Sequence, residues 1–159
     1  MRKKILSLLL VIAMVVSFVP GQAVAAENMM ITVDSVTVTA GQKSVRVPVR
    51  VANAKPVAGL ALQFDIPADI TLTAVEKGEA IPAGPTFDQT PEAKYAGIDY
   101  NENFQCSEGI LFTLVLDVSA EATGKLEISA YPSDNDEYSI VDETPTPVPV
   151  TFVPGTITV

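Results

Sequence analysis

Residues 110–118, with the sequence ILFTLVLDV, decide the fold class of this chain. The larger apolar side chains occupy every second position of this stretch, from Ile110 to Val118. A period of two residues is typical of a β-strand with one buried face. The same alternation recurs in residues 45–51, 60–66 and 125–130. Shorter strand candidates are residues 31–38, 70–75, 94–100, 137–141 and 150–159.

Helical periodicity is weak throughout the chain. Only residues 90–94 and 119–123 fit a short helical turn, and no longer stretch repeats every 3.6 residues. Eight or nine strands separated by Gly and Pro in a single domain indicate an all-β protein, and more specifically a β-sandwich.

Two strand candidates have irregular features. The apolar residues have odd numbers in residues 31–33 and even numbers in residues 36–38, with Asp34 and Ser35 between the two segments. A bulge at this point would let one strand serve both sheets. Pro48 has no N–H for a ladder hydrogen bond, so residues 45–51 are predicted to form an edge strand.

The first 25 residues have the pattern of a secretory signal peptide. Arg2, Lys3 and Lys4 precede the apolar residues 5–19, and residues 23–25 (AVA) offer a cleavage site between small residues. The alternative is a membrane anchor, but the apolar run is shorter than the ~20 residues of a spanning helix. We therefore expect a secreted, extracellular domain over residues 26–159, with no membrane span after cleavage.

The composition excludes several chemistries. The 159 residues include no His, no Trp and one Cys, which rules out Ser-His-Asp catalysis, His-ligated zinc and an internal disulfide. The formal net charge is −9, and it becomes −12 without the three basic residues of the leader. This acidity argues against a nucleic-acid partner and favours a partner with a basic surface.

One face of the predicted sandwich is unusually apolar for a solvent face. If the larger apolar set points inward, three strands have outward positions that include Leu111, Val115, Ala61 and Tyr95. Exposed apolar area on a sheet often marks a protein interface. Scattered surface hydrophobes are the alternative, because they are normal on soluble proteins.

Four stretches, taken in order and spacing, resemble the cohesin domain of bacterial cellulosome scaffoldins. They are residues 44–51 (SVRVPVRV); residues 64–67 (FDIP) with Leu72, Val75 and Gly78; residues 109–118 with residues 122–124 and 126–128; and residues 134–136 (DND) with residues 150–155 and 157–159. The resemblance extends over about residues 29–159.

The resemblance implies a nine-stranded jelly-roll β-sandwich and a non-catalytic function. Cohesins bind the dockerin modules of secreted polysaccharide-degrading enzymes or scaffold subunits, and so assemble cellulosome-type complexes. Dockerins dock on the sheet formed by strands 8, 3, 6 and 5. No cofactor is expected in the chain itself, since the calcium belongs to the dockerin. Contact with plant polysaccharide would be indirect.

The resemblance also implies which residues contact the dockerin. On the third strand they are Ala61 and Gln63, where many cohesins have a polar Asn-x-Asp. Gly59 and Ala61 stand there in this chain, which favours a more apolar dockerin. The remaining expected contacts are assigned to a fifth strand and its exit (Tyr95, Gly97, Asp99, Asn101 and Glu102) and to a sixth strand (Leu111, Thr113 and Val115).

Two other classes stay open. A secreted carbohydrate-binding module would share the β-sandwich, but such modules present aromatic platforms, and this chain has four Tyr and no Trp. An inert structural domain of a surface protein would explain the fold without the apolar outer face. Carboxylate pairs such as Asp99 and Glu102 would have to face each other across a cleft to act as a glycosidase, and we expect no enzyme.

Two local motifs have alternative interpretations. Residues 134–137 (DNDE) look like a calcium loop, but they lack the Gly and the bidentate Glu of an EF-hand. An acidic turn before a strand is the simpler interpretation, with a peripheral ion as the alternative. Cys106 could be a free thiol, a small buried residue or half of an intermolecular disulfide.

Overall fold

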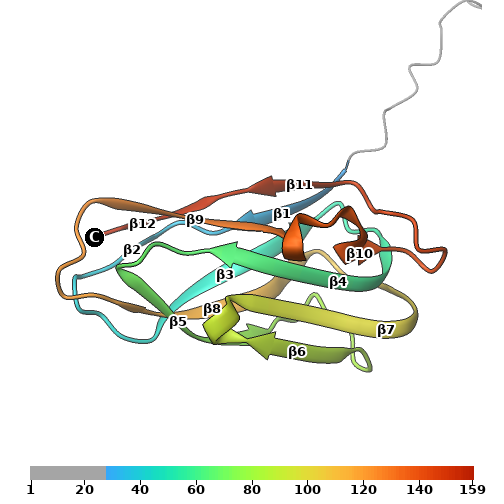
Figure 1. Ribbon diagram of the computed structural model, residues 1–159, viewed down its shortest axis with the longest axis horizontal. Helices are drawn as coiled ribbons and strands as arrows, with labels where there is room; N and C mark the ends of the chain where they lie inside the picture. Colours follow the sequence, from blue (N-terminus) through green and yellow to red (C-terminus); the bar gives the residue numbers. More distant parts are fainter. Residues whose placement is uncertain (1–27) are drawn as a thin grey trace, which may run out of the picture.

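The computed structural model describes residues 28–159, apart from the side chains of residues 99–103 and 135. The predicted signal peptide, residues 1–25, lies outside the described residues. Two sheets pack face to face to form a sandwich (Figure 1). Within residues 28–159, no helix is long and apolar enough to cross a membrane.

The first sheet has five strands in the order β11-β1-β3-β8-β5. Its members are β11 (Val150–Val153), β1 (Met29–Val33), β3 (Val45–Ala52), β8 (Gly109–Val118) and β5 (Ile70–Lys77). All pairs in it are antiparallel except β1 with β11, which is parallel.

The second sheet has the order β2-β12-β9-β4-β7-β6, and β10 also pairs with β4. Its members are β2 (Val36–Thr37), β12 (Gly155–Thr158), β9 (Lys125–Pro132), β4 (Pro56–Asp65), β7 (Tyr95–Gln105), β6 (Thr86–Thr90) and β10 (Ile140–Val141). Three 3₁₀ turns accompany these strands: η1 (Pro91–Ala93), η2 (Ser133–Asn135) and η3 (Glu137–Ser139).

The first and last strands each cross from one sheet to the other. β1 pairs with β3, whereas β2 pairs with β12, so the predicted break at Asp34 and Ser35 is confirmed. Residues 150–159 form β11 and β12 rather than one strand, because Pro154 interrupts them. A Cβ on Gly155 would lie 2.6 Å from the carbonyl oxygens of Val33 and Asp34, so the two crossings can pass this closely only at glycine.

The jelly-roll prediction is confirmed. With β1/β2 and β11/β12 each counted as one interrupted strand, and the two-residue β10 left out, the sandwich has nine strands. In that count β9, β4, β7 and β6 are strands 8, 3, 6 and 5, and they neighbour each other in this order. The core lies between the sheets, where the rings of Phe87 on β6 and Phe112 on β8 are 5.7 Å apart.

The prediction that residues 45–51 form an edge strand is wrong. β3 pairs with β1 on one side and with β8 on the other. Pro48 is tolerated because it lies just past the end of β1, which stops at Val33 opposite Val49. The Pro48 carbonyl accepts the N–H of Asp34 at 2.9 Å, and no further ladder bond is required there.

The predicted orientation of Leu111 is also wrong, because β8 contains a bulge. Val49 lies opposite Phe112 and Arg50 lies opposite Ile110, so Leu111 is an extra residue without a partner on β3. A bulge redirects side chains. Leu111 is 0% exposed and belongs to the core, while Ile110 is half-buried.

Three shorter predictions had different outcomes. The helical turn in residues 90–94 is confirmed as η1, whereas residues 119–123 contain a turn and no helix. Residues 137–141 form η3 followed by the two-residue β10 instead of one strand. Strand β6 was not predicted, because its sequence TFDQT has only one apolar residue.

Candidate functional site

We call the outer surface of β9, β4, β7 and β6 the front face; it is turned toward the viewer in Figure 1. The register of β6, β7 and β4 places their outer positions in three rows across the sheet. The rows are Thr90–Tyr95–Gln63, Asp88–Gly97–Ala61 and Thr86–Asp99–Gly59. The middle row therefore brings Gly97 and Ala61 together at the centre of the face, and Gly59 follows on β4 in the lower row.

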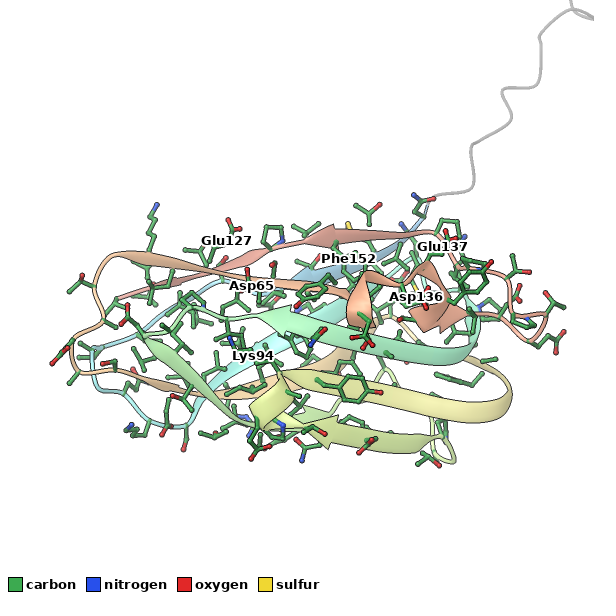
Figure 2. The ribbon with its side chains drawn as sticks, viewed as in Figure 1. Asp65, Lys94, Glu127, Asp136, Glu137 and Phe152 are labelled. Atoms are coloured by element: carbon green, nitrogen blue, oxygen red, sulfur yellow. The ribbon has the colours of Figure 1, made fainter. Side chains whose placement is uncertain are left out.

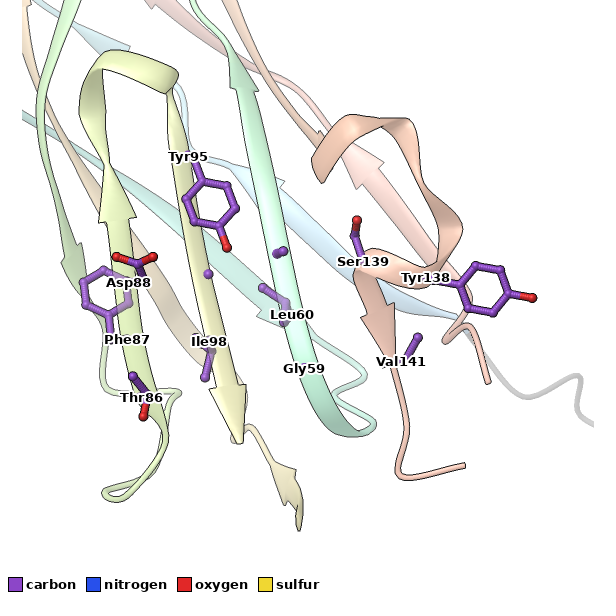
Figure 3. A pocket seen from close by; sticks show the side chains of 12 residues that line it. Gly59, Leu60, Thr86, Phe87, Asp88, Tyr95, Ile98, Tyr138, Ser139 and Val141 are labelled. Carbon is purple, nitrogen blue, oxygen red and sulfur yellow. The ribbon is translucent and has the colours of Figure 1, made fainter. Parts of the chain in front are cut away.

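Tyr95 lies along its own strand. A Cβ on Gly97 would be 2.3 Å from the Tyr95 hydroxyl oxygen and 2.9 Å from the ring carbon that bears it. The ring can therefore extend over residue 97 only because that residue is glycine. Figure 3 shows the Tyr95 ring following β7 in this way.

These small residues leave a hollow of about 550 Å³ in the front face. Its floor consists of Gly59, Ala61 and Gly97. On one side stand Thr86 and Asp88 of β6 and Tyr95 of β7, and on the other side stand Tyr138, Ser139 and Val141 (Figure 3). The hollow is open to solvent along the sheet, so it suits a side chain of a partner that lies flat on the face.

A raised lobe, residues 133–139, borders the hollow. β9 pairs with residues Leu62 to Asp65 at the end of β4, and β10 pairs with Leu60 and Gly59 of the same strand. The lobe, which contains η2 and η3, connects β9 to β10. Within it the Ser139 hydroxyl donates to the Ser133 carbonyl at 2.7 Å. Tyr138 is 57% exposed at the top of the lobe, and its ring points away from β4 in Figure 3.

Gln63 connects this lobe to the opposite side of the face. Its Nε2 donates to the Ala93 carbonyl in η1, and its Oε1 accepts the N–H of Asp134 in η2, both at 3.4 Å. Gln63 was predicted to contact the partner. The structure gives its amide an internal role as well, which is to hold the segments on both sides of β4.

The charge on the front face is mainly negative. Asp88 is the one carboxylate among the described residues that line the hollow, and Asp136 and Glu137 are exposed on the lobe (Figure 2). Lys94, which lies between η1 and β7, donates from its Nζ to the Ile66 carbonyl at 2.7 Å. The hollow itself is lined by no Lys or Arg among the described residues.

The structure divides the predicted contact residues into three groups. Ala61, Gln63, Tyr95 and Gly97 lie together on the front face. Asp99, Asn101 and Glu102 lie on β7, but their side chains are outside the described residues. The third group, Leu111, Thr113 and Val115, lies on β8 in the other sheet, so its predicted place beside the first group is wrong.

The missed strand β6 explains this error. Without it, residues 109–118 appear to be the sixth strand, whereas they are the seventh. The hydrophobic alternation could not reveal the shift, because β6 is polar and mostly exposed. Five residues that line the hollow were also missed, because they lie on β6, on the irregular lobe or on the two-residue β10: Thr86, Asp88, Tyr138, Ser139 and Val141.

We call the outer surface of β3, β8 and β5 the rear face, and ion pairs cover it. The Arg46 guanidinium binds both carboxylate oxygens of Glu76 across β8, and Arg50 Nε lies 2.8 Å from Asp34 Oδ2. Thr113 is only 8% exposed, and Val115 is half-buried. The expected apolar patch is therefore absent from the described surface of β8.

Hydrogen bonds hold two carboxylates of the rear face in their ionised form. The bond from Arg46 lowers the pKa of Glu76. The backbone N–H of Ser44 donates to Asp117 at 3.0 Å and lowers the pKa of Asp117, with a smaller contribution from Lys43.

Cys106 and the acidic residues 134–137 are the remaining candidate groups from the sequence. Cys106 is a free, buried thiol whose pKa burial raises to about 11, so it is a poor nucleophile at neutral pH. Residues 134–137 belong to the lobe and form parts of η2 and η3. In residues 28–159, no group of three or more His, Cys, Asp or Glu is arranged to hold a metal ion.

Comparison with solved structures places this sandwich among cohesin modules. The third ScaB cohesin of R. flavefaciens, solved in complex with a group 1 dockerin, has a TM-score of 0.66 and 18% identity, over 85% of this chain and 96% of that one. A non-cellulosomal cohesin of Archaeoglobus fulgidus has a TM-score of 0.62 and 21% identity, over 82% and 90%.

A third similar structure is the third cohesin ScaC of Acetivibrio cellulolyticus, in complex with the ScaB dockerin. Its TM-score is 0.61 at 18% identity, over 82% of this chain and 98% of that one. No protein-family model and no curated protein matches the sequence. The fold of this chain is thus that of the cohesins, and the resemblance seen in the sequence agrees with it.

Proposed function

We propose that this chain is a non-catalytic cohesin module that binds a dockerin through its front face. The observation that carries the proposal is the order β9-β4-β7-β6, which is the 8-3-6-5 sheet on which cohesins receive dockerins. Two of the similar structures are themselves complexes with dockerins. The dockerin would belong to a secreted polysaccharide-degrading enzyme or to a scaffold subunit.

The geometry of the front face suits a helix that lies on a sheet. Gly59 and Ala61 on β4 are small, so a helix can approach the backbone of β4 closely, beside the Tyr95 ring that covers Gly97 of β7. Exposed carboxylates at the rim would increase the association rate with a basic partner and orient it. Calcium would be needed by the EF-hand-like loops of the dockerin and not by this chain.

We also propose that the protein acts outside the cell, after removal of residues 1–25. The basic start, the apolar run and the small-residue site of the leader support export. Export also fits a partner that degrades polysaccharides. A mature protein that begins at Ala26 when isolated from the culture medium would support this, and a cell-retained chain that keeps residues 1–25 would contradict it.

Binding of residues 26–159 to a panel of dockerins, with calcium and then with EDTA, tests the proposed function. The proposal predicts tight capture of at least one dockerin and its release by EDTA. Soluble plant polysaccharides serve as the parallel ligand. Retention on a polysaccharide without any dockerin binding would instead support a carbohydrate-binding module and overturn the proposal.

A further inference from the structure

The hollow of the front face has a definite chemical character. Its floor is backbone and one methyl group, one side is the Tyr95 ring, and its only described carboxylate is that of Asp88. Asp88 lies directly opposite Gly97 across the β6–β7 pair, so its side chain stands at the edge of the floor. Figure 3 shows the carboxylate on the same side of the hollow as the Tyr95 ring.

The described ion pairs leave Asp88 without a cationic partner. The three ion pairs found in residues 28–159 involve Asp117, Glu76 and Asp34, all of which belong to or adjoin the other sheet. The one side-chain bond described for Asp88 is local: its Oδ1 accepts the N–H of Gln89 at 2.8 Å. Its other oxygen can therefore accept a donor from a partner molecule.

Three kinds of partner side chain can be compared in this hollow. A purely apolar side chain would cover Asp88 and remove water from an unpaired charge, which is costly. An acidic side chain would be repelled by Asp88 and by the acidic lobe. A Lys or Arg side chain would satisfy both parts of the hollow, because its methylene stem packs on apolar surface while its head binds a carboxylate.

We infer that the hollow takes a Lys or Arg side chain from the docking helix of the dockerin, with the stem along the Tyr95 ring that covers Gly97 and the cationic head at Asp88. Tyr95 would add a contact between the cation and its ring. This inference rests on the proposed function and deepens it. It makes Asp88, a residue outside the predicted contact set, a determinant of which dockerin binds.

A double-mutant cycle tests the inference on any dockerin that binds. Asp88→Asn should weaken binding by about 30-fold, because truncating one partner of a desolvated charge pair is expensive. The matched control is Asp65→Asn, which removes one exposed carboxylate at the end of β4, outside the hollow. Each Lys and Arg of the docking helix is then changed to Gln, alone and together with Asp88→Asn.

The inference predicts that one basic dockerin residue couples to Asp88 and that Asp65→Asn changes the affinity less than about threefold. An affinity that Asp88→Asn leaves unchanged, or coupling to no basic residue, would overturn the inference while the proposed function stands. If no dockerin binds at all, the proposed function fails, and this inference fails with it.

Discussion

The rear face of the sandwich carries long charged side chains that pair with one another, whereas the centre of the front face carries Gly and Ala. Arg46 and Glu76 lie across β8 and neutralise each other. Opposite them, Asp88 on the front face has no described ion pair and borders a hollow. A face whose charges are already paired has few groups left to bind a partner. An open face with an unpaired carboxylate can bind a basic group of a partner.

The largest expected effect concerns β8, the strand first expected to present an apolar outer surface. Leu111→Ala should lower the free energy of unfolding by about 2–5 kcal/mol, because it empties a fully buried site. Ile110→Ala, next to it and half-buried, should cost about 1 kcal/mol. Urea unfolding measures both; equal costs would contradict the bulge that directs Leu111 inward.

A smaller effect is expected at the open side between the two sheets. The Gln89 side chain of β6 reaches across to β5, where its Oε1 accepts the Val75 N–H at 2.9 Å. Gln89→Ala should lower the free energy of unfolding by about 1 kcal/mol, since it leaves a part-buried donor unsatisfied.

Thr90→Ala, a change at the exposed neighbouring position, is the control for Gln89→Ala in the same urea titration. It should change the stability by less than about 0.5 kcal/mol. If the two variants are equally stable, the hydrogen bond that Gln89 makes between the sheets does not contribute to the free energy of unfolding.

The smallest effect is the loss of folding stability at low pH, and it should depend on the paired carboxylates of the rear face. The pKa values of Glu76 and Asp117 are lowered by hydrogen bonds, and that of Asp142 is lowered by the backbone N–H of Thr146 and by the hydroxyl and backbone N–H of Thr144. Such groups stabilise the fold above their unfolded-state pKa, and this contribution is lost as the pH falls through the folded-state pKa.

Thermal unfolding between pH 6 and pH 2 measures this loss. Stability should fall below about pH 4, and Glu76→Gln should reduce the slope of that fall. The control is Asp65→Asn, for an exposed carboxylate with no described ion pair. A slope that Glu76→Gln does not alter would show that the paired rear face contributes nothing to the pH dependence.

Much of the fold could be predicted because the core strands alternate strictly. Residues 45–51, 60–66 and 125–130 have one buried face each, and a period of two reveals them. The break at Asp34 was visible as a change of phase. Leu111 was not predictable, because a bulge shifts the phase of a strand that is apolar on both sides and leaves no sign in the sequence.

The candidate site was only half predictable, for a related reason. Ala61 and Gly97 could be placed because they lie on alternating strands. The other half lies on β6, which is polar, and on the lobe of residues 133–139, which is irregular. These segments obtain their position from pairing with β7 and from the Gln63 bridge, which are contacts between distant parts of the chain.

The most direct test of the account is the dockerin affinity of a matched pair of variants, Ala61→Arg and Val115→Arg, measured by calorimetry. Both positions are half-buried and point outward, one on each face. Ala61→Arg fills the hollow and should weaken binding by about 100-fold, or about 2.8 kcal/mol, whereas Val115→Arg should leave it unchanged. Loss of binding in Val115→Arg with full affinity in Ala61→Arg would contradict the account and place the dockerin on the rear face.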